Sequence, residues 1–363
     1  MFKQIDELLI KKKADRSLLF FGIFNNKYFW ETNQTIFFYE REIGKLLKFG
    51  NLTRSLLLGN SYLYLENKIV TGTERRLMNL KDLNISMIDK EIKLYSCNTE
   101  YCIGIHQSTG DTVALTMSDF KELWKKEGKH YFVQHEEFTF SNRPYDLALY
   151  DNASGDLIWH FPSFSQFDYE EKIFTPPERR KAMFKTIFCV YNDIVWLSVD
   201  PGRILGLSIT NGELKYNITQ PKSYPKDHNP KFERSSFFGA YSQFDEQRGM
   251  LFGLLHEEYW EIDLNNPDEG LMLYSFKESC KKFGLIADGN IRQPFTNDEI
   301  FFYSGYPKEN AIGVFDRNNK EIIWAAPVKK SLTGFPPIRR MEYSNDKLYV
   351  VTDDWHLIVY QRE

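Results

Sequence analysis

Five arginines stand at corresponding places in the sequence, each just ahead of an apolar run that predicts a strand. A guanidinium group binds carboxylates and phosphates through a planar fork of donors. If those strands line a common centre, the arginines would form a partial ring at one mouth of a channel, suited to an acidic side chain, a carboxylate or a phosphate. The alternative is that each arginine pairs with a carboxylate or a backbone carbonyl of a neighbouring unit. The five are Arg76, Arg180, Arg234, Arg292 and Arg340.

Two long connections between predicted strands are rich in aromatic residues. They span Pro162–Pro177 and Gln220–Glu233, and each is expected to end at the arginine of the next unit. Long loops with aromatic anchors commonly carry binding sites on rigid scaffolds. The alternative is that these loops merely cover one face. The candidate binding residues on them are Phe164, Phe167, Tyr169, Tyr224 and His228.

The sequence contains no recognisable catalytic motif. His256 and Glu258 would share one face of a strand, but the pair of histidines four residues apart that metalloproteases carry on a helix is missing. A nucleophile elbow, a phosphate loop and a dinucleotide fingerprint are missing as well. We therefore expect no catalytic residues and no metal site.

Composition indicates an ordinary globular protein rich in β-structure. The 363 residues are 42% hydrophobic, 26% charged and 16% aromatic, and aromatic side chains favour strands. A net charge of −4 argues against a nucleic-acid partner. No apolar run of about 18 residues predicts a membrane span, and the apolar part at Ile5–Ile10 is too short for a signal peptide. We expect a cytoplasmic monomer whose four cysteines are reduced thiols in strands.

These candidate residues are set in a repeated structural unit. The unit is a strand, a turn containing Gly, Asn or Asp, and a strand with an aromatic residue. Room for two more strands lies ahead of each copy. Four antiparallel strands recurring about every 50 residues are typical of a propeller blade. The six copies are Thr35–Phe49, Cys102–Thr116, Asp146–Phe161, Arg203–Ile218, Tyr259–Phe276 and Ala311–Pro327.

The repeat predicts an all-β fold with one domain over residues 1–363, a single β-propeller of seven four-stranded blades. Eight blades are the alternative, because the extra apolar runs within Ser55–Asn67 are either an insertion or a further unit. The C-terminal region supplies three strands, so an N-terminal strand is expected to complete the last blade and remove two open edges. A two-sheet sandwich is the rival fold. Helix is predicted only for Met117–Gly128 and a short amphipathic segment at the N-terminus.

One copy of the unit resembles a known repeat. The pattern is aliphatic, any residue, aliphatic, Asp, two residues, Ser or Thr, Gly, three residues, Trp. Ala148–Trp159 fits it with Tyr150 at the third position, and Gly313–Trp324 is similar. This pattern resembles the pyrroloquinoline-quinone-like, or quinoprotein-like, propeller repeat. The resemblance implies that the turn joins the third and fourth strands of a blade and that Trp159 and Trp324 are buried between blades. The quinone enzymes of that superfamily carry a vicinal disulfide and a calcium site. Because this sequence has no adjacent cysteines, we expect neither quinone nor calcium, and no other cofactor.

Two functions remain open from the sequence. The first is a non-catalytic scaffold that binds another protein through its loop face, in one version an immunity-type protein of a bacterium that blocks a toxin from its own genome. The second is an enzyme or a binder of anionic sugars that uses the arginines at the channel mouth. A deep pocket with converging His and Arg side chains would favour the second function, and a flat aromatic loop face would favour the first.

Overall fold

The structure is a computed structural model that describes residues 1–9, 18–24, 27–32, 35–40, 45–49, 52–58, 62–69, 72–80, 84–98, 100–128, 132–135, 138–143, 146–171, 178–200, 202–227, 242–287, 293–305, 310–328, 338–352 and 356–363. Arg234, Arg292 and His228 lie outside these ranges.

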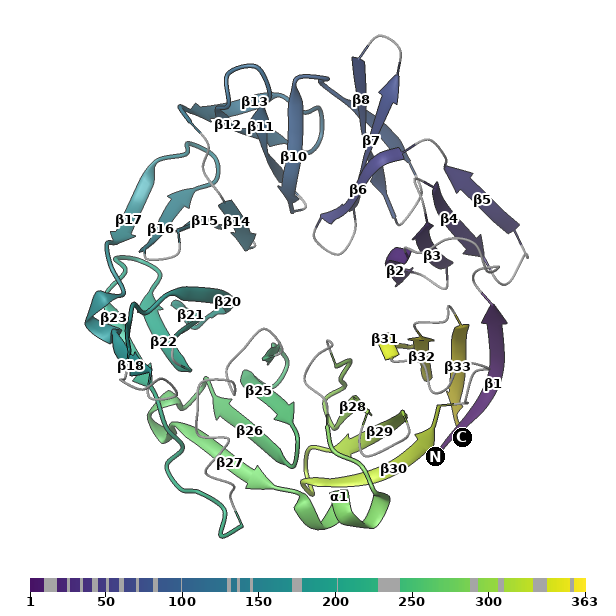
Figure 1. Ribbon diagram of the computed structural model, residues 1–363. Coiled ribbons are helices and arrows are strands. Elements are labelled where there is room, and N and C mark those ends of the chain that lie inside the picture. The colour runs from purple at the N-terminus through teal and green to yellow at the C-terminus, as the bar shows by residue number, and fades with distance from the viewer. Residues whose placement is uncertain are drawn as a thin grey trace.

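The described residues form eight antiparallel sheets of three or four strands, and Figure 1 shows them standing in a ring. Seven sheets have four strands and one has three. In all but one, the strands pair in their order along the chain. Figure 1 shows the first strand of a sheet, such as β14 or β20, on the inside of the ring and the last, such as β17, on the outside.

The first four sheets contain sixteen strands. They are β2 (Leu18–Phe24), β3 (Lys27–Thr32), β4 (Thr35–Glu40) and β5 (Lys45–Phe49); β6 (Leu52–Leu58), β7 (Tyr62–Ile69), β8 (Gly72–Asn79) and β9 (Ile85–Ile88); β10 (Ile92–Cys97), β11 (Tyr101–His106), β12 (Thr112–Thr116) and β13 (Glu122–Lys126); and β14 (Phe132–His135), β15 (Phe138–Arg143), β16 (Asp146–Asp151) and β17 (Leu157–Phe161).

The remaining sheets follow a two-stranded ribbon formed by β18 (Tyr169–Glu171) and β19 (Glu178–Arg180). They are β20 (Phe184–Tyr191), β21 (Ile194–Val199), β22 (Arg203–Ser208) and β23 (Leu214–Ile218); β24 (Gln243–Asp245), β25 (Met250–Leu255), β26 (Glu258–Asp263) and β27 (Leu271–Ser275); β28 (Glu299–Ser304), β29 (Ala311–Asp316) and β30 (Glu321–Pro327); and β1 (Phe2–Leu9) with β31 (Ile338–Ser344), β32 (Lys347–Thr352) and β33 (His356–Arg362).

The two ends of the described chain meet in one sheet. β1 pairs antiparallel with β33 from Phe2 opposite Arg362 to Leu9 opposite His356, so the N-terminal segment supplies the fourth strand beside β31–β33, as predicted. The prediction that the same segment forms a short amphipathic helix is wrong. Its backbone groups find partners on β33, and Phe2 is buried against Phe301 and Trp324. Tertiary packing has therefore overridden a helical pattern of apolar residues.

The predicted helix at Met117–Gly128 is also wrong. Residues 117–119 form a turn, Phe120 has φ of 56°, and the chain continues as β13. Within β13, Leu123 is exposed and Trp124 is buried, which is the alternation of a strand. The one α-helix in the described part is α1 (Lys277–Phe283), which ends at Gly284 in a left-handed conformation. Single 3-10 turns occur at Ser165–Phe167 and Pro267–Glu269.

The apolar runs at Ser55–Asn67 are not an insertion in a neighbouring sheet. They lie in β6 and β7, which pair with β8 and β9 to make a four-stranded sheet of their own. No disulfide joins the four cysteines, all of which are buried; three lie in strands and Cys280 lies in α1. No helix in the described ranges has both the length and the apolar character of a membrane span.

Four sheets share one backbone device at the turn between their third and fourth strands. A carbonyl oxygen at the end of the third strand accepts a hydrogen bond from the N–H four residues later, and that later residue has positive φ. The register of pairing shifts beside this turn, and an aromatic residue follows four positions further on. The acceptor, positive-φ and aromatic residues are Thr116, Phe120 and Trp124; Asp151, Gly155 and Trp159; Ser208, Gly212 and Tyr216; and Asp316, Lys320 and Trp324.

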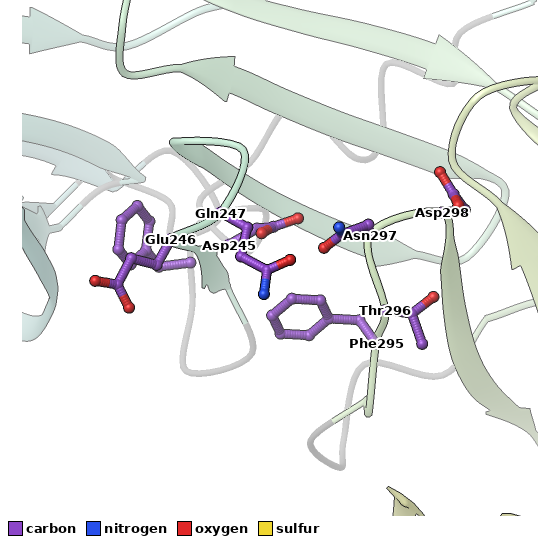
Figure 2. Close-up of a pocket in the computed structure, with 8 residues that line it drawn as sticks. Asp245, Glu246, Gln247, Phe295, Thr296, Asn297 and Asp298 are labelled. Carbon is purple, nitrogen blue, oxygen red and sulfur yellow. The ribbon is translucent and has the colours of Figure 1, made fainter. Parts of the chain in front are cut away.

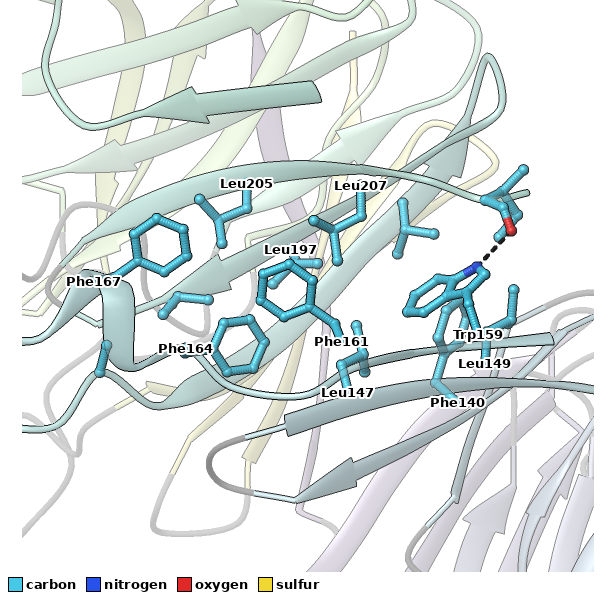
Figure 3. Packing of buried hydrophobic residues seen from close by; sticks show 14 residues of the cluster. Phe140, Leu147, Leu149, Trp159, Phe161, Phe164, Phe167, Leu197, Leu205 and Leu207 are labelled. Atoms are coloured by element: carbon cyan, nitrogen blue, oxygen red, sulfur yellow. Dashed lines mark hydrogen bonds between the residues drawn. The ribbon is translucent and has the colours of Figure 1, made fainter. Parts of the chain in front are cut away.

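In two of the four sheets the aromatic residue of this device, Trp124 or Trp159, docks on the turn of the next sheet. Figure 3 shows Trp159 with its Nε1–H donating to the carbonyl oxygen of Ile209 at 2.7 Å, and a Cβ added to Gly212 would lie 2.8 Å from the indole ring. Trp124 donates in the same way to Asn152 (2.7 Å). Trp159 is therefore buried between sheets, as the repeat implied.

Trp324 differs from Trp159. It is only half-buried, and it packs at 5.4 Å from the ring of Phe2 and 6.0 Å from that of Tyr360. The next sheet offers no turn at this place, because its outer strand is β1 and comes from the other end of the chain. Trp324 therefore lies between two sheets as predicted, but it is less buried than Trp159.

Candidate functional site

The three described arginines of the predicted set, Arg76, Arg180 and Arg340, do not occupy corresponding places in their sheets. Arg76 lies in β8, the third strand of its sheet, and not ahead of an innermost strand. Arg180 lies in β19, outside the main sheets, and Arg340 lies in β31, the first strand of its sheet. Arg76 is therefore not part of any ring of the predicted kind.

Each described arginine of the set has a carboxylate partner two residues away. Arg76 contacts Glu74 at 2.7 Å and Arg180 contacts Glu178 at 2.6 Å. Arg340 contacts Glu342 at 2.8 Å. Alternate residues of a strand share a face, which explains the common spacing. All three pairs are at least partly exposed, so each contributes little to stability.

Phe164 and Phe167 are not exposed binding residues. Both are buried in the cluster that joins β14–β17 to β20–β23, as Figure 3 shows. Phe164 packs at 5.1 Å from Phe161, and the guanidinium of Arg203 lies 5.3 Å above the ring of Phe167. Their apolar area fills the space between the connection and β22, where Leu205 is also buried. They are anchors of the loop and not its contact surface.

These anchors hold the ribbon β18–β19, which is the candidate functional site. Tyr169 pairs with Arg180 and Glu170 pairs with Arg179 across the two strands. The carboxylate of Asp168 accepts a hydrogen bond from the backbone N–H of Ala182 at 2.9 Å, which fixes one end of the ribbon to the chain that leaves it.

The surface of the ribbon carries charges of both signs. Tyr169 is half-buried, whereas the charged residues around it are exposed. A firmly seated base with exposed charges of both signs can hold a complementary surface in one register. The described part of the ribbon contains no nucleophile beside a base. The exposed residues are Glu170, Glu178, Arg179, Arg180 and Lys181.

The second predicted loop is described as far as Asp227. Lys222 donates its backbone N–H to the carbonyl oxygen of Leu271 (3.1 Å), so this segment runs along β27. The hydroxyl of Ser275 donates to Asp227 at 2.8 Å and holds the far end. Tyr224, between these two ties, is 42% exposed and is the one predicted aromatic residue that offers a contact surface.

An open pocket of about 570 Å³ lies between two adjacent turns. One turn follows β24 and the other precedes β28, and Figure 2 shows Phe295 lying between them. Asp245 lines the pocket but is buried, and Glu246 and Asp298 are exposed. The rest of the lining is Phe244, Gln247, Thr296 and Asn297.

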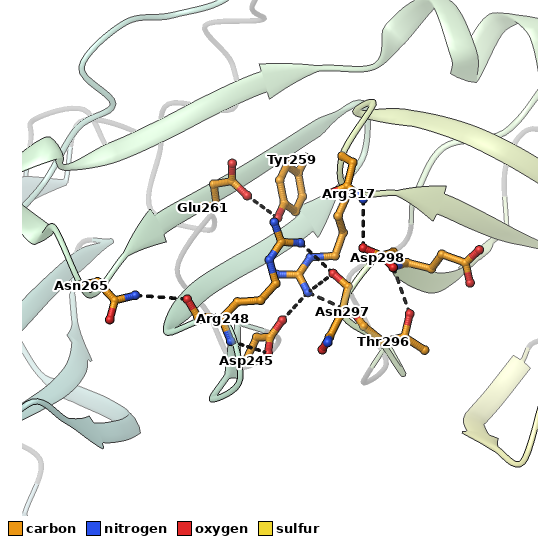
Figure 4. A network of polar contacts seen from close by, with 11 residues as sticks. Asp245, Arg248, Tyr259, Glu261, Asn265, Thr296, Asn297, Asp298 and Arg317 are labelled. Carbon is orange, nitrogen blue, oxygen red and sulfur yellow. Dashed lines mark hydrogen bonds and ion pairs between the residues drawn. The ribbon is translucent and has the colours of Figure 1, made fainter.

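A buried arginine next to this pocket forms an ion pair with the carboxylate of Asp245. Arg317 is 0% exposed and contacts Asp245 at 2.5 Å. Its Nη1 also donates to the carbonyl oxygens of Thr296 and Asn297, both at 3.1 Å, as Figure 4 shows. Its guanidinium lies 4.3 Å above the ring of Phe252. This network joins two sheets and leaves Asp245 committed to a structural ion pair.

A tyrosine completes the network. The hydroxyl of Tyr259 donates to Glu261 at 2.7 Å, and Lys320 also pairs with Glu261 at 2.9 Å. Burial, and then the charge of Glu261, raise the pKa of Tyr259 above its usual value, so the phenol remains a donor at all ordinary pH values.

Two of these structural residues could have been found in the sequence. Arg317 follows the acceptor of the repeated turn by one position, as Asn152 and Ile209 do, and all three are buried. Trp124 was hidden because Phe120 stands where the clearest copy has Gly155. Aligning the copies on the final aromatic residue would have found both positions.

The comparisons with known proteins bear on the fold alone. No protein-family model matches the sequence, and no curated protein matches it either. The structure is similar to a computationally designed protein called Ika8 (TM-score 0.56, 9% identity, 96% of this chain and 97% of that one) and to BamB from Moraxella catarrhalis (0.53, 9%, 100% of both). It is also similar to the dihydro-heme d1 dehydrogenase NirN in complex with DHE (0.51, 11%), covering 84% of this chain and 64% of that one. BamB and NirN are β-propellers, so these likenesses support the propeller fold.

Proposed function

We propose that this chain is a non-catalytic β-propeller scaffold that binds another protein through the face carrying the ribbon β18–β19. The proposal rests on one observation: the connection between β17 and β20 has buried aromatic residues at its base and exposed charged residues on its surface. Phe164 and Phe167 are buried beneath it, and Arg179, Arg180 and Glu178 are exposed on it. Ordering a loop in advance lowers the entropic cost of binding, which is the use we assign to the aromatic anchors.

In this proposal the eight sheets are eight blades, and the pairing of β1 with β33 closes the ring. The three-stranded sheet would gain its inner strand from the residues ahead of β28. Phe295 bridges Ile300 in antiparallel fashion, and the N–H of Phe301 donates to the carbonyl oxygen of Pro294 at 2.8 Å, which supports such a hairpin. The proposed number of blades is therefore eight, instead of the seven expected from the sequence.

A binder of anionic sugars at an arginine mouth has less support. Arg76 is in a third strand, and the three described arginines of the set have a carboxylate within contact distance. An anion would therefore have to displace a glutamate at each of them.

The test is a capture experiment with the immobilised protein and one matched control. We expect R180A to weaken retention of the partner at least tenfold, because a central interface arginine contributes more than 1.4 kcal/mol. K215A is the control, because Lys215 of β23 forms a similar exposed pair with Glu213 (2.8 Å) outside the two strands of the ribbon. Both variants should melt like the parent. Equal retention by all three proteins would contradict the ribbon as the binding site.

In its narrower form the proposal makes the partner a toxin encoded beside this chain. Co-expression of a neighbouring toxin gene with the parent protein should restore growth, and co-expression with R180A should not. Unrestored growth with the parent would contradict the narrower form and leave the capture experiment to judge the broader one.

A further inference from the structure

Outer strands of sheets expose unpaired backbone groups, and proteins usually protect such edges from other chains with charges, prolines, bulges or covering segments. Most outer strands here have such protection. β13, β17, β23, β30 and β1 pair with the strand inside them through a shifted register. β5 contains Lys45 and Lys48, and β27 is covered by Pro221 and Lys222.

β9 has none of these protections. Its four residues, Ile-Ser-Met-Ile, are uncharged, and its pairing with β8 runs without a register shift. Among the described residues no segment pairs with its outer edge. Ile85 is 39% and Met87 is 57% exposed, although both are large and apolar.

The backbone hydrogen-bonding groups of these same two residues, Ile85 and Met87, are directed away from β8. Asn79 donates its N–H to the carbonyl oxygen of Asn84 at 2.9 Å, in register with the β8–β9 pairs. Bonded and non-bonded pairs alternate in an antiparallel ladder, so Ser86 and Ile88 face β8 with their backbone groups. The N–H and C=O groups of Ile85 and Met87 therefore face away from the sheet.

We propose that β9 is an acceptor edge to which an extended segment of another protein adds as a fifth strand. Backbone groups of Ile85 and Met87 would pair with the segment, and its apolar residues at alternate positions would pack beside the two exposed side chains. A small or polar residue would lie beside Ser86. This site is on a different sheet from the ribbon and does not depend on the function proposed above.

The size of the edge favours a short segment over a second folded copy of this chain. Four residues of strand extend about 13 Å. A stable dimer of folded proteins buries about 800 Å² per partner, far more than a strip of that length offers.

The test is selection from a displayed library of random nine-residue peptides. We expect peptides with apolar residues at alternate positions to be enriched on the parent protein and to bind M87K at least tenfold more weakly. L123K is the matched control, since Leu123 is 37% exposed on the bulged strand β13. M87P, which removes an outward N–H without removing a bond to β8, should also lose binding.

Three outcomes would overturn the proposal. One is the absence of any peptide enriched on the parent over M87P, and another is an equal loss of binding in L123K and M87K. The third is a parent protein that dimerises in sedimentation experiments while M87K stays monomeric, because a second copy would then occupy the edge. Both M87 variants should melt within a few degrees of the parent, which a melting curve checks first.

Discussion

The charged side chain of Arg317 has no access to solvent, because other groups of the protein surround it. The carboxylate of Asp245, two backbone carbonyls and the ring of Phe252 lie against one guanidinium group. Burying an ion pair costs much of what the attraction returns, so the pair is weak evidence of net stabilisation. Breaking it is a different matter, because the remaining charge is left buried without a partner.

We expect R317A to lower the free energy of unfolding by about 3–5 kcal/mol, since Asp245 would keep a buried charge. Chemical denaturation measures this difference. R248A is the control, because Arg248 donates to the same Asn297 carbonyl oxygen (2.7 Å) from a half-buried position and leaves the ion pair intact. A loss in R248A as large as that in R317A would show that the shared carbonyl bond matters and the ion pair does not.

Asp151 makes one turn sensitive to acid. Hydrogen bonds from the backbone and side chain of Ser154 hold the pKa of this carboxyl below its usual value. A lowered folded-state pKa adds stability above the unfolded-state value, near pH 4, and that stability is lost as the pH falls through the folded-state pKa. Asparagine can accept the backbone bonds from Ala153 and Ser154 at its Oδ1 and does not titrate. We expect the melting temperature of D151N to fall less than that of the parent between pH 5 and pH 2, and parallel curves would contradict this.

At the scale of elements, the turn between third and fourth strands does two jobs. Its positive-φ residue closes the turn, and in two sheets, at Gly155 and Gly212, the turn also receives the tryptophan of the preceding sheet. Gly212 differs from a turn glycine that only supplies a positive φ, because an added Cβ would also meet the ring of Trp159. Gly110 has a similar φ, 78° against 71°, but nothing lies within 4 Å of a Cβ built on it.

We expect G110A to cost about 1–2 kcal/mol, which is the penalty of a left-handed alanine. G212A should cost about 1–3 kcal/mol more, because the methyl group would displace the ring of Trp159. Unfolding in urea gives both values. If the two variants were equally destabilised, the contact between Gly212 and Trp159 would carry no energy.

The tryptophan can be tested directly as well. We expect W159A to cost about 3–5 kcal/mol, through the cavity and the lost bond to Ile209. I158A, which truncates the exposed neighbour on the same strand, should stay within about 0.5 kcal/mol of the parent. Similar melting temperatures for W159A and I158A would mean that the sheets do not depend on this contact.

The same turns show what could be predicted from the sequence and what could not. Gly155 and Trp159 stand in a recognisable pattern, so the strands around them and the burial of Trp159 were predicted correctly. At β13 a helix was predicted because Ser118 is a good N-cap and Gly128 a good helix stop. These local signals hold no information on the partner strand β12, with which this segment pairs. Phe164 and Phe167 were expected on the surface because their burial depends on Leu205, which is distant in sequence. The outcome for such residues is decided by packing and not by spacing.

At the scale of the molecule, one sheet differs from the others because it combines strands from both ends of the described chain. Phe2 lies against Phe301 and Tyr343 as well as Trp324, so β1 links its own sheet to the one before it. The N–H of Glu363 donates to the carbonyl oxygen of Met1 at 2.8 Å, which places the two ends of the described chain side by side.

We expect removal of residues 1–9 to destabilise the protein by more than the 3–5 kcal/mol of a single buried aromatic truncation. The outer edge of β33 would also be exposed and promote association. Thermal melting and light scattering measure the two effects. Adding a peptide of residues 1–9 should raise the melting temperature again, and a truncated protein that melts like the parent would contradict the role given to β1.

The pairing of β1 with β33 also sets a delay in biosynthesis. The ribosome makes β1 about 350 residues before its partner, which at 5–20 residues per second is about 20–70 s. The other sheets can form from strands that are consecutive in the chain as they emerge, but this one has no complete set until β33 has left the exit tunnel. During that interval β1 is an unpaired strand on a growing chain, open to capture by chaperones or by wrong strands. A segment made about 350 residues before its partner is therefore among the last to reach its native place.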